Sequence, residues 1–268
     1  METKSMKSQN NTGNANNSRS GGNLVFHLFI LLFFMTLPFL QSCKKDTSVF
    51  PPAGAPNNYL SDKDYKKLII EIQYVQGYQP TAQTITNLTN FLLARLNKPG
   101  GITVVAESIP SPGKSFYTLD DISAIEKTHR TQRPHDGIMA AYFLFVDADY
   151  ADNNSSGKVL GIAYGATSMT IFEKTITDYS GGFGQPTRDV LESSVTEHEF
   201  GHLLGLVNNG TRMQTNHQDG ANGHHCNNQN CLMYYATETS NIVANLIGGN
   251  VPTLDANCIN DLRGNGGK

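Results

Sequence analysis

Residues 187–206 read TRDVLESSVTEHEFGHLLGL and are predicted to form one long helix. His198 and His202 lie four positions apart in it, so both imidazoles project from the same face, one turn apart, and can reach one ion. Neutral imidazole is a ligand that suits zinc. Glu199 stands beside the first histidine, where it can hold and deprotonate a water on the metal. The competing interpretation is a pair of surface histidines on an amphipathic helix.

The motif continues to Gly205, so the pattern becomes His-Glu-x-x-His-x-x-Gly. A glycine at this point can end the helix with a positive φ and turn the chain back toward the ion. The pattern resembles that of the metzincin clan of zinc peptidases, whose common version has a third histidine three residues past the glycine. Asn208 holds that position here, and an amide oxygen is a poor zinc ligand. The resemblance therefore requires a third ligand from elsewhere in the chain.

Residues 225–233, HCNNQNCLM, resemble the archaemetzincin signature of His-Cys, four residues, Cys, one residue and Met. This resemblance implies that His225 is the third zinc ligand. It also implies that Met233 belongs to a tight turn under the zinc site, with residues 206–224 inserted between the helix and the third ligand. The second zinc site of that family needs a later Cys-x-x-Cys, which this chain lacks.

Three other residues are candidates for the third ligand. His217 and His224 lie in the same polar loop as His225. Glu238 would be a carboxylate ligand of a different class of zinc peptidase, and the presence of Gly205 and Met233 argues against that class. His225 is the residue that the resemblance favours.

Two interpretations remain for the pairing of the cysteines in and near this loop, and two for the role of Tyr235. Cys226 and Cys231 are close enough in sequence to form a disulfide in an oxidising compartment, which would leave Cys258 free. The alternative is three reduced thiols, with Cys258 buried on the last helix. Tyr235 has the spacing at which some metzincins place a tyrosine near the metal, but packing against the core is its expected role.

The remainder of the chain has an α/β pattern, in which strands and helices alternate. This pattern and the resemblance together imply a zincin fold, with a mixed twisted sheet, two long helices and a small irregular subdomain after Gly205. The resemblance places the substrate-binding edge of the sheet near residues 163–171. Strands are expected at 67–75, 102–109, 138–146 and as a pair within 161–172, and helices at 81–96, 119–130, 187–206 and 253–263.

The N-terminal region predicts a lipid anchor. Residues 1–42 have a positive segment followed by an apolar run, which is the layout of a secretory signal. They end in Leu40-Gln-Ser and are followed by Cys43, a pattern that resembles the lipobox of bacterial lipoproteins. Cys43 would then carry the lipid (palmitate), residues 43–58 would be a Pro-rich tether, and residues 59–268 the catalytic domain. A plain signal anchor with an incidental cysteine is the alternative.

Composition narrows the function further. The net charge of -3 offers no basic field for nucleic acid, and 38% hydrophobic residues are enough for a folded core. We therefore expect a monomeric, membrane-anchored zinc-dependent peptidase of the bacterial cell envelope, facing the periplasm or the outside. It would cleave a peptide or protein substrate with a Zn²⁺-activated water and Glu199 as general base. The alternative is a non-catalytic surface lipoprotein, a binding module that retains a zinc-binding helix.

Overall fold

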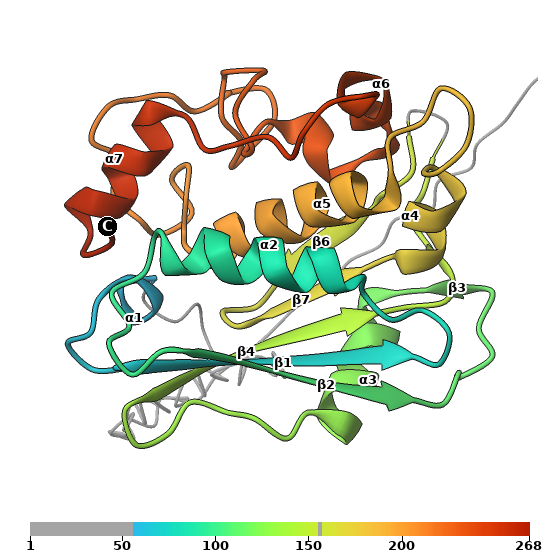
Figure 1. The fold of residues 1–268 in the computed structure, drawn as a ribbon, viewed down its shortest axis with the longest axis horizontal. Coiled ribbons are helices and arrows are strands. Elements are labelled where there is room, and N and C mark those ends of the chain that lie inside the picture. Colours follow the sequence, from blue (N-terminus) through green and yellow to red (C-terminus); the bar gives the residue numbers. More distant parts are fainter. Residues whose placement is uncertain (1–55, 155–156) are drawn as a thin grey trace, which may run out of the picture. The chain divides into compact units, whose positions relative to one another are not determined.

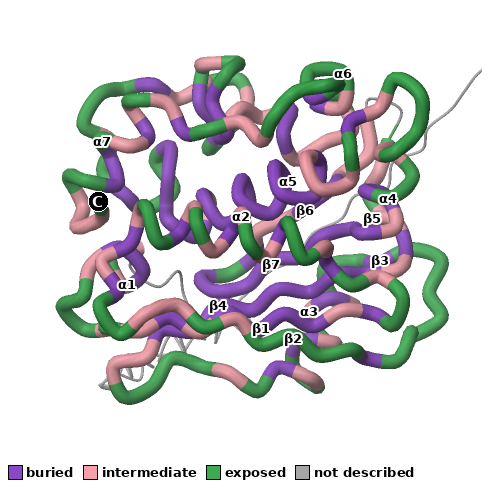
Figure 2. Tube along the Cα trace, viewed as in Figure 1, coloured by how far each residue is buried: buried purple, intermediate pink, exposed green. Residues whose placement is uncertain are grey.

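A twisted five-stranded sheet with the strand order β2-β1-β4-β7-β6 forms one layer of the structure (Figure 1). All neighbouring strands are parallel except β6 and β7, so β6 is an antiparallel edge strand. β4 is the middle strand and is buried at every position after its first residue (Figure 2), as its continuous apolar sequence predicted. The strands are β1 (Lys67–Val75), β2 (Ile102–Ile109), β4 (Ile138–Phe145), β6 (Gly161–Tyr164) and β7 (Ser168–Ile171). A separate small sheet pairs β3 (Phe116–Tyr117) with β5 (Asp149–Tyr150).

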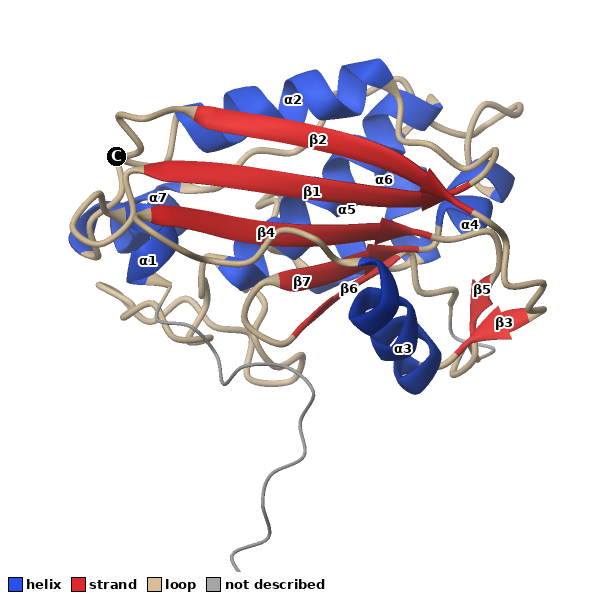
Figure 3. Ribbon diagram, turned by 90° about the horizontal axis from the view of Figure 1, so that it is seen from below, coloured by secondary structure: helices blue, strands red, loops and turns tan. Residues whose placement is uncertain are grey.

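Helices cover both faces of the sheet, which confirms the α/β class. The long helices α2 (Ala82–Leu93) and α5 (Arg188–Leu203) pack on one face, and α3 (Leu119–His129) lies on the other (Figure 3). Both long helices start at a threonine, Thr81 or Thr187, whose side chain accepts a backbone N–H bond from the first turn. Helix α5 is buried continuously from residue 191 to residue 201, so its charged and polar side chains lie inside the protein.

The chain after α5 is irregular and lies on the side of α5 away from the sheet (Figure 1). Gly205 ends the helix with φ 72°, as its place in the motif predicted. A side chain could not be accommodated there, because a Cβ atom would lie 2.7 Å from the backbone nitrogen of Thr211. The remaining short helices are α1 (Asn57–Leu60), α4 (Glu173–Asp178), η1 (Tyr235–Glu238), η2 (Ser240–Ile242), α6 (Val243–Leu246) and α7 (Ala256–Gly264).

The computed structural model describes residues 56–154 and 157–268. The expected signal peptide (1–42), the lipidation site Cys43 and nearly all of the expected tether (43–58) lie outside the described residues. Close to the first described residue, Tyr59 and Leu60 are already fully buried in the core. Within the described residues, no helix combines the length and the apolar character needed to cross a membrane.

Lys98 fixes this first part of the folded chain to the end of the sheet. Its ammonium group is nearly buried and donates hydrogen bonds to the carbonyl oxygens of Asn58 (2.8 Å), Tyr65 (2.6 Å) and Ser61. We expect Lys98→Met to lower the free energy of unfolding by about 2–4 kcal/mol, because three carbonyls lose a charged donor. Thermal unfolding measures the change. Lys63→Met, at an exposed position, is the control, and equal midpoints for the two variants would contradict this role.

Candidate metal centre

Two imidazoles of helix α5 face each other one turn apart. The Nε2 atoms of His198 and His202 are 3.1 Å apart, and their rings meet edge to face with centroids 4.8 Å apart. His198 is fully buried. The competing interpretation of surface histidines is therefore wrong for this helix.

The polar loop brings His225 back to the same place. Its ring stacks on His198 with centroids 5.3 Å apart and lies edge-on to His202 at 5.0 Å. Two backbone hydrogen bonds hold the loop at this point: Asp219 donates to the carbonyl of His225 (2.7 Å), and Cys226 donates to that of Met233 (2.7 Å). The structure thus brings together the three histidines that the motifs single out.

A fourth side chain joins them. The Oε2 atom of Glu238 lies 3.4 Å from Nε2 of His225, and the potential ligand atoms of all four residues are within 4.8 Å of one another. The sequence reasoning weighed Glu238 only as a replacement for His225. In the structure both residues face the same point.

Backbone carbonyls orient two of the rings. Nδ1 of His198 donates to Leu232 (2.7 Å), and Nδ1 of His225 donates to Asn222 (2.5 Å). A neutral ring with its hydrogen on Nδ1 presents a bare lone pair on Nε2. Burial lowers the pKa of His198 to about 4; the charge of Glu238 partly offsets this effect and His225 adds to it, so this ring is neutral at pH 7. Lone pairs and a carboxylate oxygen that face one point repel each other unless a cation lies between them, so this donor set fits a zinc ion.

Glu199 lies next to this cluster. Both of its carboxylate oxygens are buried without a well-formed hydrogen bond among the described residues, although the N–H of Ala163 approaches them. Burial raises the pKa of Glu199 well above its ordinary value, the charge of Glu238 raises it further, and the Ala163 N–H lowers it. Gly161 allows β6 to run against this side chain, because a Cβ there would lie 2.9 Å from Oε1 of Glu199.

A hollow of about 470 Å³ opens onto these groups. One wall is the start of β6, and the opposite wall is the loop that carries His225. The edge strand of the sheet at this hollow is β6, residues 161–164. The expectation of an edge at 163–171 was therefore wrong for β7, which has β4 and β6 as partners on both sides. The lining residues include Gly161, Ala163, Glu199, His202, His225 and Glu238.

Met233 supports α5 directly below the histidine pair. It is fully buried, and a Cβ on Gly201 would lie 2.3 Å from its sulfur. Its neighbour Leu232 supplies the carbonyl that orients His198. The position that the resemblance implied for Met233 therefore depends on Gly201, a residue that was not singled out in the sequence.

We expect Gly201→Ala to destabilise the protein by about 1–3 kcal/mol, because the buried methionine has to shift. Differential scanning calorimetry checks this value. Gly220→Ala is the matched control, because no atom lies within 4 Å of a Cβ at that position. If the Gly201→Ala and Gly220→Ala proteins unfold at the same temperature, the turn that contains Met233 accommodates the extra methyl group without cost, and this prediction is wrong.

The other expected candidates lie outside the cluster. Asn208 donates to Gln218 (3.2 Å) and does not reach the histidines. His224 lines the hollow, but its Nδ1 faces the carbonyl of Val207 at 3.3 Å. Tyr235 packs against the hydrophobic core, with its ring tilted toward that of Tyr234, and it is not among the described residues that line the hollow, in agreement with a packing role.

His217 belongs to a second group of donors, with thiols from the loop and from α7. Its Nδ1 is 3.4 Å from Sγ of Cys226 and 4.0 Å from Sγ of Cys258, which in turn is 3.6 Å from Sγ of Cys231. All three cysteines are free and buried, so the expected Cys226–Cys231 disulfide is wrong. Cys258 is buried on the last helix, as the alternative interpretation had it.

This second group also fits a metal ion. Nε2 of His217 donates to Asp261 (2.8 Å), a carboxylate that fixes the ring with Nδ1 toward the thiols. Hydrogen bonds from Cys226 and Cys258 hold the pKa of Cys231 well below its usual range, and thiolate is the form that binds metals. Asp255 belongs to the same group. A set of thiols and one imidazole is typical of a closed structural zinc site.

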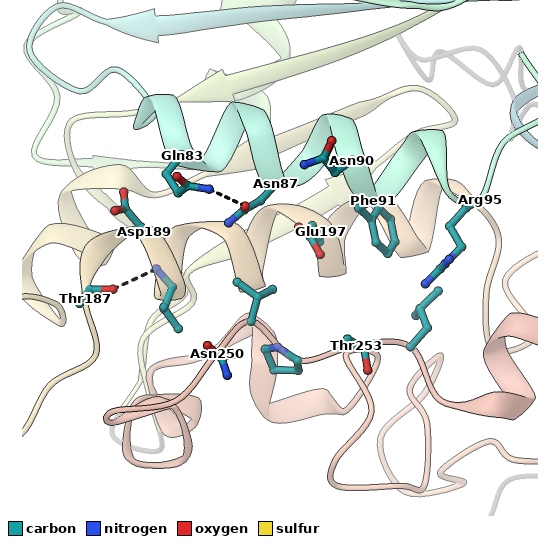
Figure 4. A pocket seen from close by; sticks show the side chains of 14 residues that line it. Gln83, Asn87, Asn90, Phe91, Arg95, Thr187, Asp189, Glu197, Asn250 and Thr253 are labelled. Atoms are coloured by element: carbon teal, nitrogen blue, oxygen red, sulfur yellow. Dashed lines mark hydrogen bonds between the residues drawn. The ribbon is translucent and has the colours of Figure 1, made fainter.

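A larger hollow of about 510 Å³ lies between α2, α5 and residues 250–254 (Figure 4). Glu197 lines it, and burial raises the pKa of this carboxyl to about 7, partly offset by Arg95. None of the three clustered histidines lines this hollow. The smaller hollow is therefore the candidate site, because the metal-binding donors and Glu199 meet there.

Comparisons with known proteins find similarity among solved structures. No protein-family model matches this chain, and no curated protein matches it. Among solved structures, it is similar to the crystal structure of archaemetzincin from Methanopyrus kandleri, with a TM-score of 0.49 and 14% sequence identity. The match covers 76% of this chain and 96% of that chain. Function has to be argued from the residues of this chain itself.

Proposed function

We propose that this protein is a zinc-dependent peptidase with His198, His202 and His225 as metal ligands. One observation supports the proposal above all others. Three imidazoles from two distant segments converge beside the buried carboxylate of Glu199, in a hollow bordered by an edge strand. Three protein ligands and an open position are the arrangement of catalytic zinc sites.

The roles of the residues follow from their positions. When bound, zinc would act as a Lewis acid that lowers the pKa of a water molecule to about 7 and polarises the scissile carbonyl. Glu199 accepts the proton of the attacking water on its carboxylate and delivers it to the leaving amine. Because the Glu199 carboxylate is buried without a well-formed hydrogen bond, it stays basic, and it lies beside the histidine cluster. The Leu232 and Asn222 carbonyls hold the rings of His198 and His225 in the orientation that binds the ion.

The substrate that fits this hollow is an extended peptide. Among the described strands, β6 is paired only with β7 in the sheet, so its other edge offers backbone groups that a peptide can bind, apart from the N–H of Ala163, which faces Glu199. Gly161, Ile162 and Ala163 line the hollow along this edge. A peptide that pairs there would pass beside Glu199 and the histidine cluster.

Metal removal and return test the activity. The full chain is incubated with casein and with a mixture of quenched fluorescent peptides, before and after dialysis against a chelator. We expect cleavage to be lost with zinc and restored when zinc is added. Chain that binds zinc at the three histidines but cleaves no peptide would support the non-catalytic binding module, an alternative that the asparagine at position 208 favours.

We also propose that the chain is attached to a membrane of the bacterial cell envelope through Cys43. Support comes from the sequence, in which Leu40-Gln-Ser-Cys43 ends the apolar segment. Metabolic labelling with a palmitate analogue tests this proposal. Label is expected on the wild-type chain and absent from Cys43→Ser, and equal label on both would exclude Cys43 as the lipid site.

A further inference from the structure

We propose that Glu238 is a fourth protein ligand at the same zinc centre and closes it until substrate displaces the carboxylate. This inference rests on the proposed function, because it needs an ion at the three histidines. It adds a form of regulation that three histidines and Glu199 alone do not provide.

Distances support a shared ion rather than an ordinary ion pair. Oε2 of Glu238 lies 3.4 Å from Nε2 of His225, 3.9 Å from that of His198 and 4.0 Å from that of His202. Ligands at about 2.0–2.1 Å from a tetrahedral zinc are about 3.3 Å from one another. The His198–His202 separation of 3.1 Å and the His225–Glu238 separation of 3.4 Å match this ligand-to-ligand distance. The distances from Glu238 to His198 and His202 are moderately longer.

Hydrogen bonding within the cluster does not explain the position of the carboxylate. His198 and His225 use their Nδ1 hydrogens on backbone carbonyls, so their Nε2 atoms have no hydrogen to donate while the rings are neutral. Nε2 of His225 and Oε2 of Glu238, 3.4 Å apart, form no well-aligned hydrogen bond, although their proximity raises the pKa of His225. A proton on His225 would stabilise the carboxylate against that one ring, whereas a metal ion also accounts for its position within 4.0 Å of all three Nε2 atoms.

The backbone holds Glu238 at the boundary between the metal centre and the edge strand. Its carbonyl accepts a hydrogen bond from Leu160 (2.8 Å), immediately before β6, and Thr239 forms a β-bridge with Val159. The helical turn η1 directly follows the turn that contains Met233. Glu238 is therefore positioned by that turn as well as by its backbone contact with the chain before β6.

The side chain of Glu238 is partly exposed and contacts the histidine cluster. Among the described residues, its ion-pair partners within 4.0 Å are the three imidazoles, and 33% of the side chain is exposed toward the hollow. An incoming carbonyl or another metal-binding group can therefore replace it without unfolding η1. Closed zinc sites have four protein ligands and catalytic sites have three, so displacement of Glu238 would convert one into the other.

Binding of a metal-directed ligand tests this inference without measuring peptide cleavage. Zinc-loaded wild type, Glu238→Gln and Glu238→Ala are titrated with acetohydroxamate by calorimetry, and zinc content is measured by mass spectrometry. We expect both variants to bind the hydroxamate about tenfold more tightly, because it no longer competes with a carboxylate. We also expect them to bind zinc about tenfold less tightly or weaker still in competition with a chelator.

Two controls separate the possible failures. Glu107→Gln removes an exposed carboxylate on β2 and should behave as wild type. The double variant His198→Ala/His202→Ala should abolish hydroxamate binding, because it leaves only one imidazole and Glu238, and this locates the signal at this centre. Zinc-loaded proteins with equal hydroxamate affinity in wild type, Glu238→Gln and Glu238→Ala would overturn the fourth-ligand role alone. Hydroxamate binding that survives in the His198→Ala/His202→Ala variant, or no binding in any form, would overturn the proposed zinc centre as well.

Discussion

Glu199→Gln is expected to reduce kcat/KM for peptide cleavage by about 10²–10⁴-fold while zinc stays bound. The amide cannot accept the proton of the attacking water, but it keeps the volume of the side chain. Because Glu199 is not among the four clustered metal-binding residues, the donor set remains complete. Initial rates on a fluorescent peptide, together with zinc content, separate the loss of the base from the loss of the metal.

Glu197→Gln is the matched control for this prediction. It makes the same chemical change two residues away on α5, but Glu197 lines the hollow between α2 and residues 250–254. It should cleave peptides at the rate of the wild-type protein. Normal cleavage by Glu199→Gln would mean that another group accepts the proton and that the proposed mechanism is wrong.

His225→Ala is expected to lower zinc affinity at the helix site by about 100-fold or more and to abolish cleavage. It removes one of the three imidazoles and leaves His198 and His202 with only the displaceable carboxylate of Glu238 beside them. His217→Ala is the decisive comparison, because His217 lies with the thiols and contacts Asp261. It should keep the peptidase activity and weaken the second metal group instead.

Zinc stoichiometry and competition with a chromophoric chelator measure both effects. The wild-type chain is expected to hold two ions, and each histidine variant one. If His217→Ala loses cleavage while His225→Ala retains it, the third ligand has been assigned to the wrong residue of the loop.

Local pattern was enough to predict the regular parts of the fold. β1 and β2 have the bounds that their β-branched alternation indicated, and α5 starts at the capping Thr187. The positive φ of Gly205 also followed from the sequence, because few other residues adopt it at low cost. These features depend on residues close together in the chain.

Features that depend on distant contacts were missed or misjudged. Glu238 reaches the histidines because its backbone is bonded to Leu160, a contact that no spacing in the sequence reveals. The short spacing of Cys226 and Cys231 favoured a disulfide, whereas α7 brings Cys258 beside Cys231 and the loop brings His217 beside Cys226. Which strand of the pair within 161–172 forms the edge was likewise decided by the strand order of the whole sheet.

An anomalous difference map at the zinc absorption edge, from crystals of the zinc-loaded protein, tests the central claim most directly. We expect a peak about 2.0–2.1 Å from the Nε2 atoms of His198, His202 and His225. A map without a peak between these rings, or with His225 turned away and no other donor in its place, would contradict the zinc centre and the peptidase function built on it.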